Sequence, residues 1–170
     1  MLQNKCRSDD VIKSMKLFNF YVFNRSGDCL YYREWERPQN TLHDDLDEER
    51  KLVFGMLFSL KDLSGKLSPL TATPGGQPGE AAPCQLQAVK TKAFTMHHYE
   101  STTGLMLVLN TDPEATSQYQ RLEHIYKNIW IEYIMRSPIY SATRNEQIQS
   151  VIFDTKLEEY LFSSAPASMR

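Results

Sequence analysis

Residues 47–67, DEERKLVFGMLFSLKDLSGKL, form the longest strongly apolar stretch of the chain and decide how the rest of it is organised. An α-helix turns about 100° per residue, and at that spacing the stretch predicts one amphipathic helix that ends near Leu67, before Pro69. Its acidic start suits the N-terminal end of a helix, where exposed N–H groups and the dipole favour negative charge. We expect about one third of its circumference to face the core. This stripe consists of Leu52, Val53, Met56, Leu57, Leu60, Leu63 and Leu67.

Two phenylalanines lie outside that stripe and mark a second face of the same helix. Phe54 and Phe58 are four residues apart, and the face around them otherwise carries charged, polar and small residues. Two interpretations stay open: a core wider than one stripe, or a binding surface for a protein partner. Leaving the rings exposed forgoes about 1.5–3 kcal/mol of burial each, and small residues beside them would let another backbone approach closely. The candidate partner-binding residues are Lys51, Phe54, Gly55, Phe58 and Ser59.

Two strands are predicted before the helix. Residues 16–24 alternate, with Leu17 and Tyr21 on one face, and are apolar on both faces, which is typical of a strand inside a sheet. Residues 28–36 are rich in tyrosine and tryptophan, which fit a half-buried pleated surface. A turn at Gly27 joins the two strands, so we expect an antiparallel hairpin.

Three strands and two helices are predicted after the helix. The strands cover residues 86–91, 93–100 and 105–110, the first at an edge and the last in the centre. The helices cover residues 112–136, with Asp112 as N-cap, and 145–162. The order β-β-α-β-β-β-α-α predicts an α+β fold: one five-stranded antiparallel sheet, with the long helix on one face and two helices on the other.

The length of 170 residues fits one domain with a real core. We expect this domain to span residues 16–163, between a flexible extension over 1–15 and a flexible tail over 164–170. Residues 69–85 are rich in proline and glycine and predict a mobile loop within the domain.

Composition excludes several classes of protein. The net charge is −2 with both signs dispersed, so there is no basic stripe for nucleic acid. No run reaches the ~18–20 apolar residues that span a bilayer, and the first residues lack the apolar region of a secretory signal, so membrane contact would be peripheral. The odd set of Cys6, Cys29 and Cys84 is typical of reduced thiols in a cytosolic setting.

No catalytic constellation stands out in the sequence. His97 and His98 are adjacent, so on a strand they face opposite sides and cannot share a metal ion; we expect structural or surface roles for both. The acidic residues at the start of the helix lack the glycine and spacing of an EF-hand. Phosphate-loop, dinucleotide and GxSxG patterns are also missing. We therefore expect no enzyme, no cofactor and no metal site.

Four segments together resemble a known family. They are FYVFNRSGDCLYYREW, KLVFGMLFSLKDLSGKLSP, KTKAFTMHHYESTTGLMLVLNTD and LEHIYKNIWIEYIMRSP, in this order. They resemble the small longin-type (sedlin-like) subunits of the transport protein particle, TRAPP, of its subunit 1 type. The resemblance covers residues 16–162, and the combination of GMLFSL with YESTTGLMLVLNTD makes it specific. The N-terminal extension and the proline- and glycine-rich loop depart from the family pattern.

The resemblance implies a profilin-like longin fold and a structural subunit of a vesicle-tethering complex in ER-to-Golgi and Golgi traffic. It implies pairing with another longin-type subunit, and a share in the platform on which a Rab-type small GTPase exchanges its nucleotide. It also implies a cytoplasmic location, peripheral at Golgi and endoplasmic reticulum membranes. Another longin-type trafficking protein stays an alternative. A small clathrin-adaptor subunit shares the opening strands but not the later motifs, and a SNARE longin domain would need a heptad segment and a membrane anchor after the domain.

Overall fold

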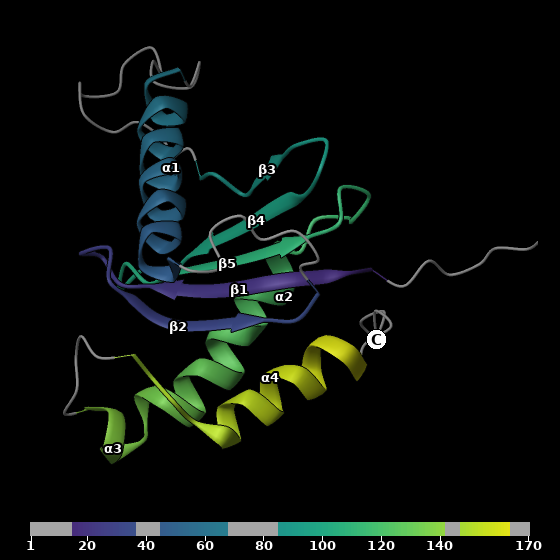
Figure 1. Ribbon diagram of the computed structural model, residues 1–170. Helices are drawn as coiled ribbons and strands as arrows, with labels where there is room; N and C mark the ends of the chain where they lie inside the picture. Colours follow the sequence, from purple (N-terminus) through teal and green to yellow (C-terminus); the bar gives the residue numbers. More distant parts are fainter. Residues whose placement is uncertain (1–14, 37–44, 68–84, 142–146, 164–170) are drawn as a thin grey trace, which may run out of the picture.

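One five-stranded antiparallel sheet forms the centre of the fold in the computed structural model, which describes residues 15–36, 45–67, 85–141 and 147–163. Its order is β2-β1-β5-β4-β3 (Figure 1). The strands are β1 Leu17–Phe23, β2 Cys29–Glu34, β3 Ala88–Lys90, β4 Thr95–Glu100 and β5 Met106–Thr111. As predicted, β1 lies inside the sheet, β5 lies at its centre, and β3 lies at an edge.

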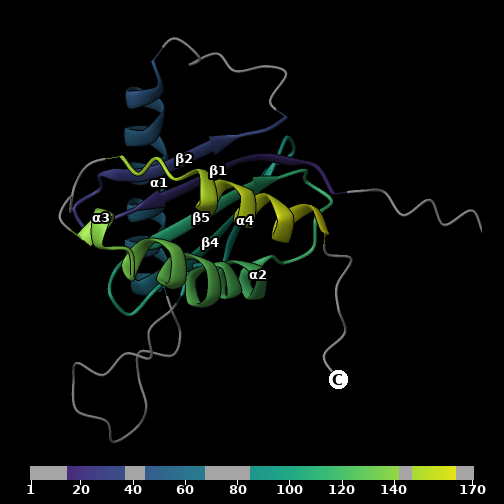
Figure 2. The same cartoon turned by 90° about the horizontal axis from the view of Figure 1, so that it is seen from below.

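Helices cover both faces of the sheet, so the fold has three layers. The long helix α1, Leu46–Leu67, lies on one face, and the C-terminal helices lie on the other (Figures 1 and 2). The C-terminal helices are α2 Tyr119–His124, the π-helix η2 Ile125–Met135, α3 Pro138–Ser141 and α4 Val151–Ser163. The predicted α+β architecture and element order are confirmed, and the short α3 is an addition to them.

The two faces of the sheet support cores of different size. Between the sheet and the C-terminal helices, Phe20 and Leu107 pack in one buried cluster with Trp130 and Phe153. The cluster between the sheet and α1 is smaller, and Leu57 is its one fully buried α1 side chain among the described residues. The larger core therefore lies on the side of the C-terminal helices.

Both predicted C-terminal helices begin later than the sequence indicated. Asp112 is not an N-cap, because its backbone N–H donates to the Lys16 carbonyl at 3.2 Å and keeps this segment beside β1; α2 follows Gln118 instead. Ile148 is likewise not helical, because its N–H donates to the Leu30 carbonyl of β2 at 2.7 Å. In both places a backbone hydrogen bond, to the residue just before β1 or to β2 itself, is found where the first turns of the helix were expected.

A register shift between Leu17 and Asn19, where β1 pairs with β5, corrects the predicted alternation. Leu17 packs in the cluster with Phe20 and Val22, and not on the face of Tyr21. Apart from Met15 and Gln85, the predicted extension over 1–15, loop over 69–85 and tail over 164–170 lie outside the described residues. Within the described ranges, no helix combines the length and the apolar character needed to cross a membrane.

Candidate functional site: the surface of helix α1

Helix α1 begins as its acidic sequence predicted. The Asp45 carboxylate accepts a hydrogen bond from the Glu48 backbone N–H at 3.0 Å, which satisfies one of the free donors of the first turn. The first turn also carries Asp47 and Glu49, and the last turn carries Lys66, so the charges complement the helix dipole at both ends.

A chain of buried polar groups attaches the first turns of α1 to the sheet. Glu49 is only 3% exposed, and its carboxylate accepts a hydrogen bond from the Tyr21 hydroxyl. The Asn19 amide donates to the same hydroxyl at 2.8 Å, and the Asn110 amide donates to Asn19 at 2.7 Å. The polar chain thus runs from α1 through β1 to β5. The sequence placed Glu49 only among the acidic residues of the helix start, and its burial was not predicted.

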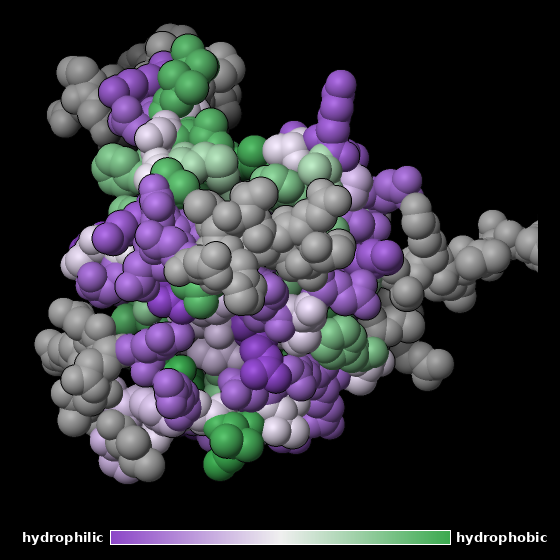
Figure 3. Space-filling view, in the orientation of Figure 1, coloured by the Kyte–Doolittle hydropathy of each residue, from purple (hydrophilic) through white to green (hydrophobic). Residues whose placement is uncertain are grey.

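The predicted core stripe of α1 is wrong at three positions. Leu52, Leu63 and Leu67 are 56%, 50% and 72% exposed, and apolar side chains gather over α1 on the face shown in Figure 3. At about 100° per residue, Leu57 lies at the margin of the stripe closest to Phe54, and Leu52 lies at the opposite margin. Since Leu57 is the residue that enters the core, the helix is rotated toward Phe54. One side of the stripe is left in solvent as a result.

The two phenylalanines of the second face have different environments. Phe54 is half-buried, and its ring lies 5.7 Å from that of Phe23 between centroids. It also packs on Gly27, where an added Cβ would lie 2.8 Å from the ring. Phe58 is 63% exposed and stacks on Phe54 at 6.3 Å. Phe54 therefore belongs to the core, and Phe58 lies on the surface beside it.

The remaining candidate residues form an open surface. Lys51, Gly55 and Ser59 are exposed, and the Ser59 hydroxyl donates to the Gly55 carbonyl at 2.8 Å. A Cβ placed on Gly55 would meet nothing within 4 Å, so the chain itself does not require glycine there. Lys66 and Asp62 form an ion pair at 2.6 Å on the same helix. The surface thus combines exposed apolar side chains with paired charges.

The two histidines of β4 face opposite sides of the sheet, as predicted. His97 Nε2 lies 3.0 Å from the Thr111 hydroxyl, and His97 Nδ1 accepts from the Gln118 N–H at 3.4 Å. His98 Nδ1 lies 2.7 Å from the Leu86 carbonyl. Burial lowers the pKa of both imidazoles, that of His97 to about 4, so both are neutral at pH 7.

Nucleophilic or metal chemistry has little support in the described part of the chain. Burial raises the pKa of the Cys29 thiol to about 11, so Cys29 is protonated at neutral pH and is a poor nucleophile. The described residues contain no group of three or more His, Cys, Asp or Glu side chains that could hold a metal ion.

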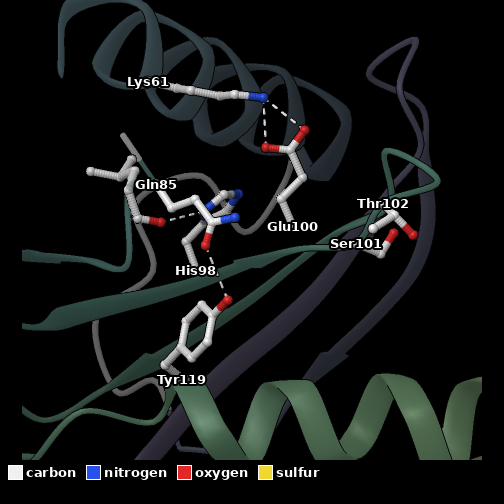
Figure 4. Close-up of a pocket in the computed structure, with 8 residues that line it drawn as sticks. Lys61, Gln85, His98, Glu100, Ser101, Thr102 and Tyr119 are labelled. Atoms are coloured by element: carbon white, nitrogen blue, oxygen red, sulfur yellow. Dashed lines mark hydrogen bonds and ion pairs between the residues drawn. The ribbon is translucent and has the colours of Figure 1, made fainter. Parts of the chain in front are cut away.

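A polar pocket beside α1 was not predicted. It has a volume of about 270 Å³ and lies among Lys61 of α1, His98 and Glu100 of β4, and Tyr119 of α2 (Figure 4). These residues are far apart in the sequence and carry no common motif. The sequence shows one local relation near this pocket: Lys61 follows Phe58 by three residues, so the two side chains are neighbours on the surface of α1.

The fold and this surface define an α+β protein of longin type, with an exposed apolar face on its long helix. The chain belongs to the Sybindin-like family, which matches residues 17–164. The resemblance found in the sequence is thereby confirmed.

Similar proteins include trafficking protein particle complex subunit 1 of Homo sapiens, which is 33% identical over 149 residues, or 88% of this chain and 94% of the human protein. The Dictyostelium discoideum protein of the same name is 30% identical over 124 residues, or 73% of this chain and 80% of that protein. Trafficking protein particle complex subunit BET5 of Saccharomyces cerevisiae is 27% identical over 139 residues, or 78% of this chain and 81% of the yeast protein.

Proposed function

We propose that this chain is a structural subunit of the trafficking protein particle complex, a vesicle-tethering complex of ER-to-Golgi and Golgi transport. The family match and the relatives named as subunits of that complex support the assignment. The chain acts from the cytoplasm, at Golgi and endoplasmic reticulum membranes, and reaches them peripherally through the complex.

The exposed apolar side of α1 is the observation that supports a role in assembly. Leu52, Leu63 and Leu67 lie on one side of the helix and are each at least half exposed. Burying such a side chain contributes about 1.5–3 kcal/mol, so covering all three would stabilise a complex substantially. The Lys66–Asp62 ion pair lies at the border of this surface, where interfaces are commonly polar. We propose that another longin-type subunit covers it.

The opposite side of α1, around Phe58, faces a second partner in this proposal. Lys51, Gly55, Phe58 and Ser59 are all exposed. Lys51 and Phe58 lie on the side away from Leu63, and Ser59, four residues before Leu63, lies at the border with the leucine side. This side would contribute to the platform on which the Rab-type GTPase exchanges its nucleotide. The chain would supply binding energy and orientation there and no catalytic group, because exchange requires deformation of the nucleotide pocket of the GTPase.

Co-expression of the full chain with the other subunits tests the assembly. We expect Leu63→Asp/Leu67→Asp to reduce recovery of the assembled complex at least about tenfold, because two charges would replace apolar groups that the partner is proposed to bury. The matched control is Val151→Asp/Ile152→Asp, since these two residues are 80% and 64% exposed on α4, across the sheet. Equal recovery with both double variants, or equal loss, would contradict a specific role for α1.

A single variant separates the two sides of the helix. Phe58→Asp should leave assembly intact and slow nucleotide exchange by the assembled complex. Phe54 is not a suitable position, because its ring packs on Phe23 and Gly27 and a charge there would destabilise the fold itself. Unchanged exchange by a complex that contains Phe58→Asp would exclude this side of α1 from the platform.

A further inference from the structure

The pocket beside α1 lies where three parts of the fold meet. Lys61 reaches it from α1, His98 and Glu100 from the end of β4, and Tyr119 from the start of α2 (Figure 4). The Tyr119 hydroxyl donates to the Gln85 side chain at 3.2 Å, and this pair forms one wall. The volume of about 270 Å³ is below the range of about 300–1,000 Å³ usual for small-molecule sites, and suits a single side chain.

His98 brings an unused hydrogen-bond acceptor to this pocket. The residue is 3% exposed, and its Nδ1 lies 2.7 Å from the Leu86 carbonyl. A carbonyl only accepts hydrogen bonds, so Nδ1 carries the proton and Nε2 of the neutral ring is an acceptor. Nε2 is buried and has no hydrogen-bond partner among the described residues. Buried polar atoms are normally satisfied, so this atom indicates a missing donor.

Glu100 provides the second acceptor. Lys61 Nζ lies 2.7 Å from one of its carboxylate oxygens and 2.5 Å from the other. Each oxygen of an ionised carboxylate has two lone pairs, so capacity for further donors is left. The neighbouring Ser101 hydroxyl is already used, because it accepts the Leu105 N–H at 3.0 Å and bonds the Thr103 hydroxyl at 2.9 Å. His98 Nε2 and the Glu100 carboxylate can therefore accept further hydrogen bonds, but neither can donate one.

We propose that this pocket binds the guanidinium group of an arginine side chain that a partner protein presents. A guanidinium is a planar set of N–H donors with no acceptor, so it can donate two hydrogen bonds to Glu100 and a third to His98 Nε2. An anionic group would instead meet the Glu100 carboxylate and the lone pair of His98.

Lys61 competes with the arginine in this arrangement. Its ammonium group is the present partner of Glu100, and its side chain is 45% exposed, so it can move into solvent when the arginine enters. Removing Lys61 should therefore strengthen the binding of a cation and weaken the binding of an anion. Because these two effects are opposite, the Lys61 variant distinguishes a cation site from an anion site even when the partner is not known. The proposal does not depend on the function proposed above.

The test is an NMR titration of the full chain, labelled with ¹⁵N in histidine, with N-acetyl-arginine amide as the probe. We expect a saturable change in the His98 Nε2 resonance toward its hydrogen-bonded position. Lys61→Met should lower the dissociation constant about three- to tenfold, and Glu100→Gln should raise it about tenfold, as expected for a charge-assisted hydrogen bond. His98→Phe should weaken binding similarly, and the nearly isosteric Glu100→Gln keeps the test valid if His98→Phe fails to fold.

Matched controls exclude general charge effects. Lys66→Met removes the same charge from the same helix but away from the pocket, and should leave the dissociation constant unchanged. N-acetyl-glutamate amide should not bind. Binding of this acidic probe, or weaker arginine binding by Lys61→Met, would overturn the proposal in favour of an anion site. A free amino acid, and not a protein side chain, would be the ligand if uncapped arginine bound far more tightly than the capped probe.

Discussion

Adjacent histidines on β4 carry their protons on different ring nitrogens. His97 Nδ1 accepts the Gln118 N–H, so its proton lies on Nε2, facing the Thr111 hydroxyl. His98 Nδ1 faces a carbonyl, so its proton lies on Nδ1. The same residue type is thus satisfied on one face of the strand and left with an unused acceptor on the other. Only the partners that the fold provides determine this difference.

His97 should make the stability of the fold depend on pH. Burial lowers its pKa to about 4 from an ordinary value of 6.5, so the unfolded chain binds a proton more readily. Its contribution is therefore complete above pH 6.5 and is lost as the pH falls from 6.5 toward 4. The expected loss is about 1–3 kcal/mol of unfolding free energy.

Urea unfolding between pH 7 and pH 4.5 measures this dependence. His97→Asn should be less stable at pH 7, where it loses two hydrogen bonds, but should show a flatter slope below pH 6.5. His98 will keep part of the slope, because burial lowers its pKa too. An unchanged slope in His97→Asn would show that His97 is not the titrating group.

The packing of α1 on the first hairpin depends on a glycine, and a second glycine on the helix provides the control. Gly27 has φ +95°, and an added Cβ would lie 2.8 Å from the Phe54 ring, so Gly27→Ala should lower the free energy of unfolding by about 1–3 kcal/mol. Gly55→Ala meets nothing within 4 Å and should raise it by about 0.5–1 kcal/mol through helix propensity. Chemical denaturation measures the free energy of unfolding of both variants. Equal changes in Gly27→Ala and Gly55→Ala would contradict the contact between Phe54 and the turn.

Helix α1 shows what the sequence could and could not predict. Its end at Leu67, its acidic start and the order of elements follow from local signals, since apolar period, capping residues and turns are encoded nearby. The rotation of the helix about its own axis cannot be predicted from local signals. Leu52 and Leu57 belong to the same stripe, and only the packing against the sheet determines which of them is buried. The predicted stripe therefore combined core residues with residues of the surface.

Competition between local and distant partners explains the other differences. Asp112 followed by Pro113 has the signature of a helix start, but the Asp112 N–H donates to the carbonyl of Lys16, the residue just before β1. The position of Phe58 outside the core stripe could be predicted from its place on the helix, and its ring is 63% exposed. The pocket could not, because Lys61, His98 and Tyr119 come together only in the folded chain.

At the scale of the whole molecule, α1 is attached to the sheet unevenly. Glu49 in its first turn and Leu57 at its middle are 3% and 1% exposed, and no residue from Leu60 to Leu67 is fully buried. The C-terminal half meets the rest of the described chain through contacts such as the Lys61–Glu100 ion pair, which is partly exposed. Partly exposed ion pairs contribute little to stability, so this half is the part of α1 most available to a partner.

Amide hydrogen exchange can measure this gradient along α1. We expect amides of the last two turns to exchange at least about tenfold faster than those near Leu57, because few buried contacts oppose their local opening. Assembly with other subunits should slow exchange in these turns more than in the first turns. Uniform protection along α1 in the free chain would contradict the uneven attachment. Unchanged exchange of the last turns after assembly would argue against their contact with a partner.

The hydrogen bond from Ile148 to Leu30 has a consequence for the behaviour of the free chain. β2 is an outer strand of the sheet, and an outer strand with unpaired backbone groups can pair with the same strand of another molecule and aggregate. Ile148 is buried, and its N–H occupies one carbonyl of this edge, just before α4 begins. The C-terminal segment therefore protects the β2 edge of the sheet against edge-to-edge association, and a variant in which α4 detaches should be prone to aggregation before it is globally unfolded.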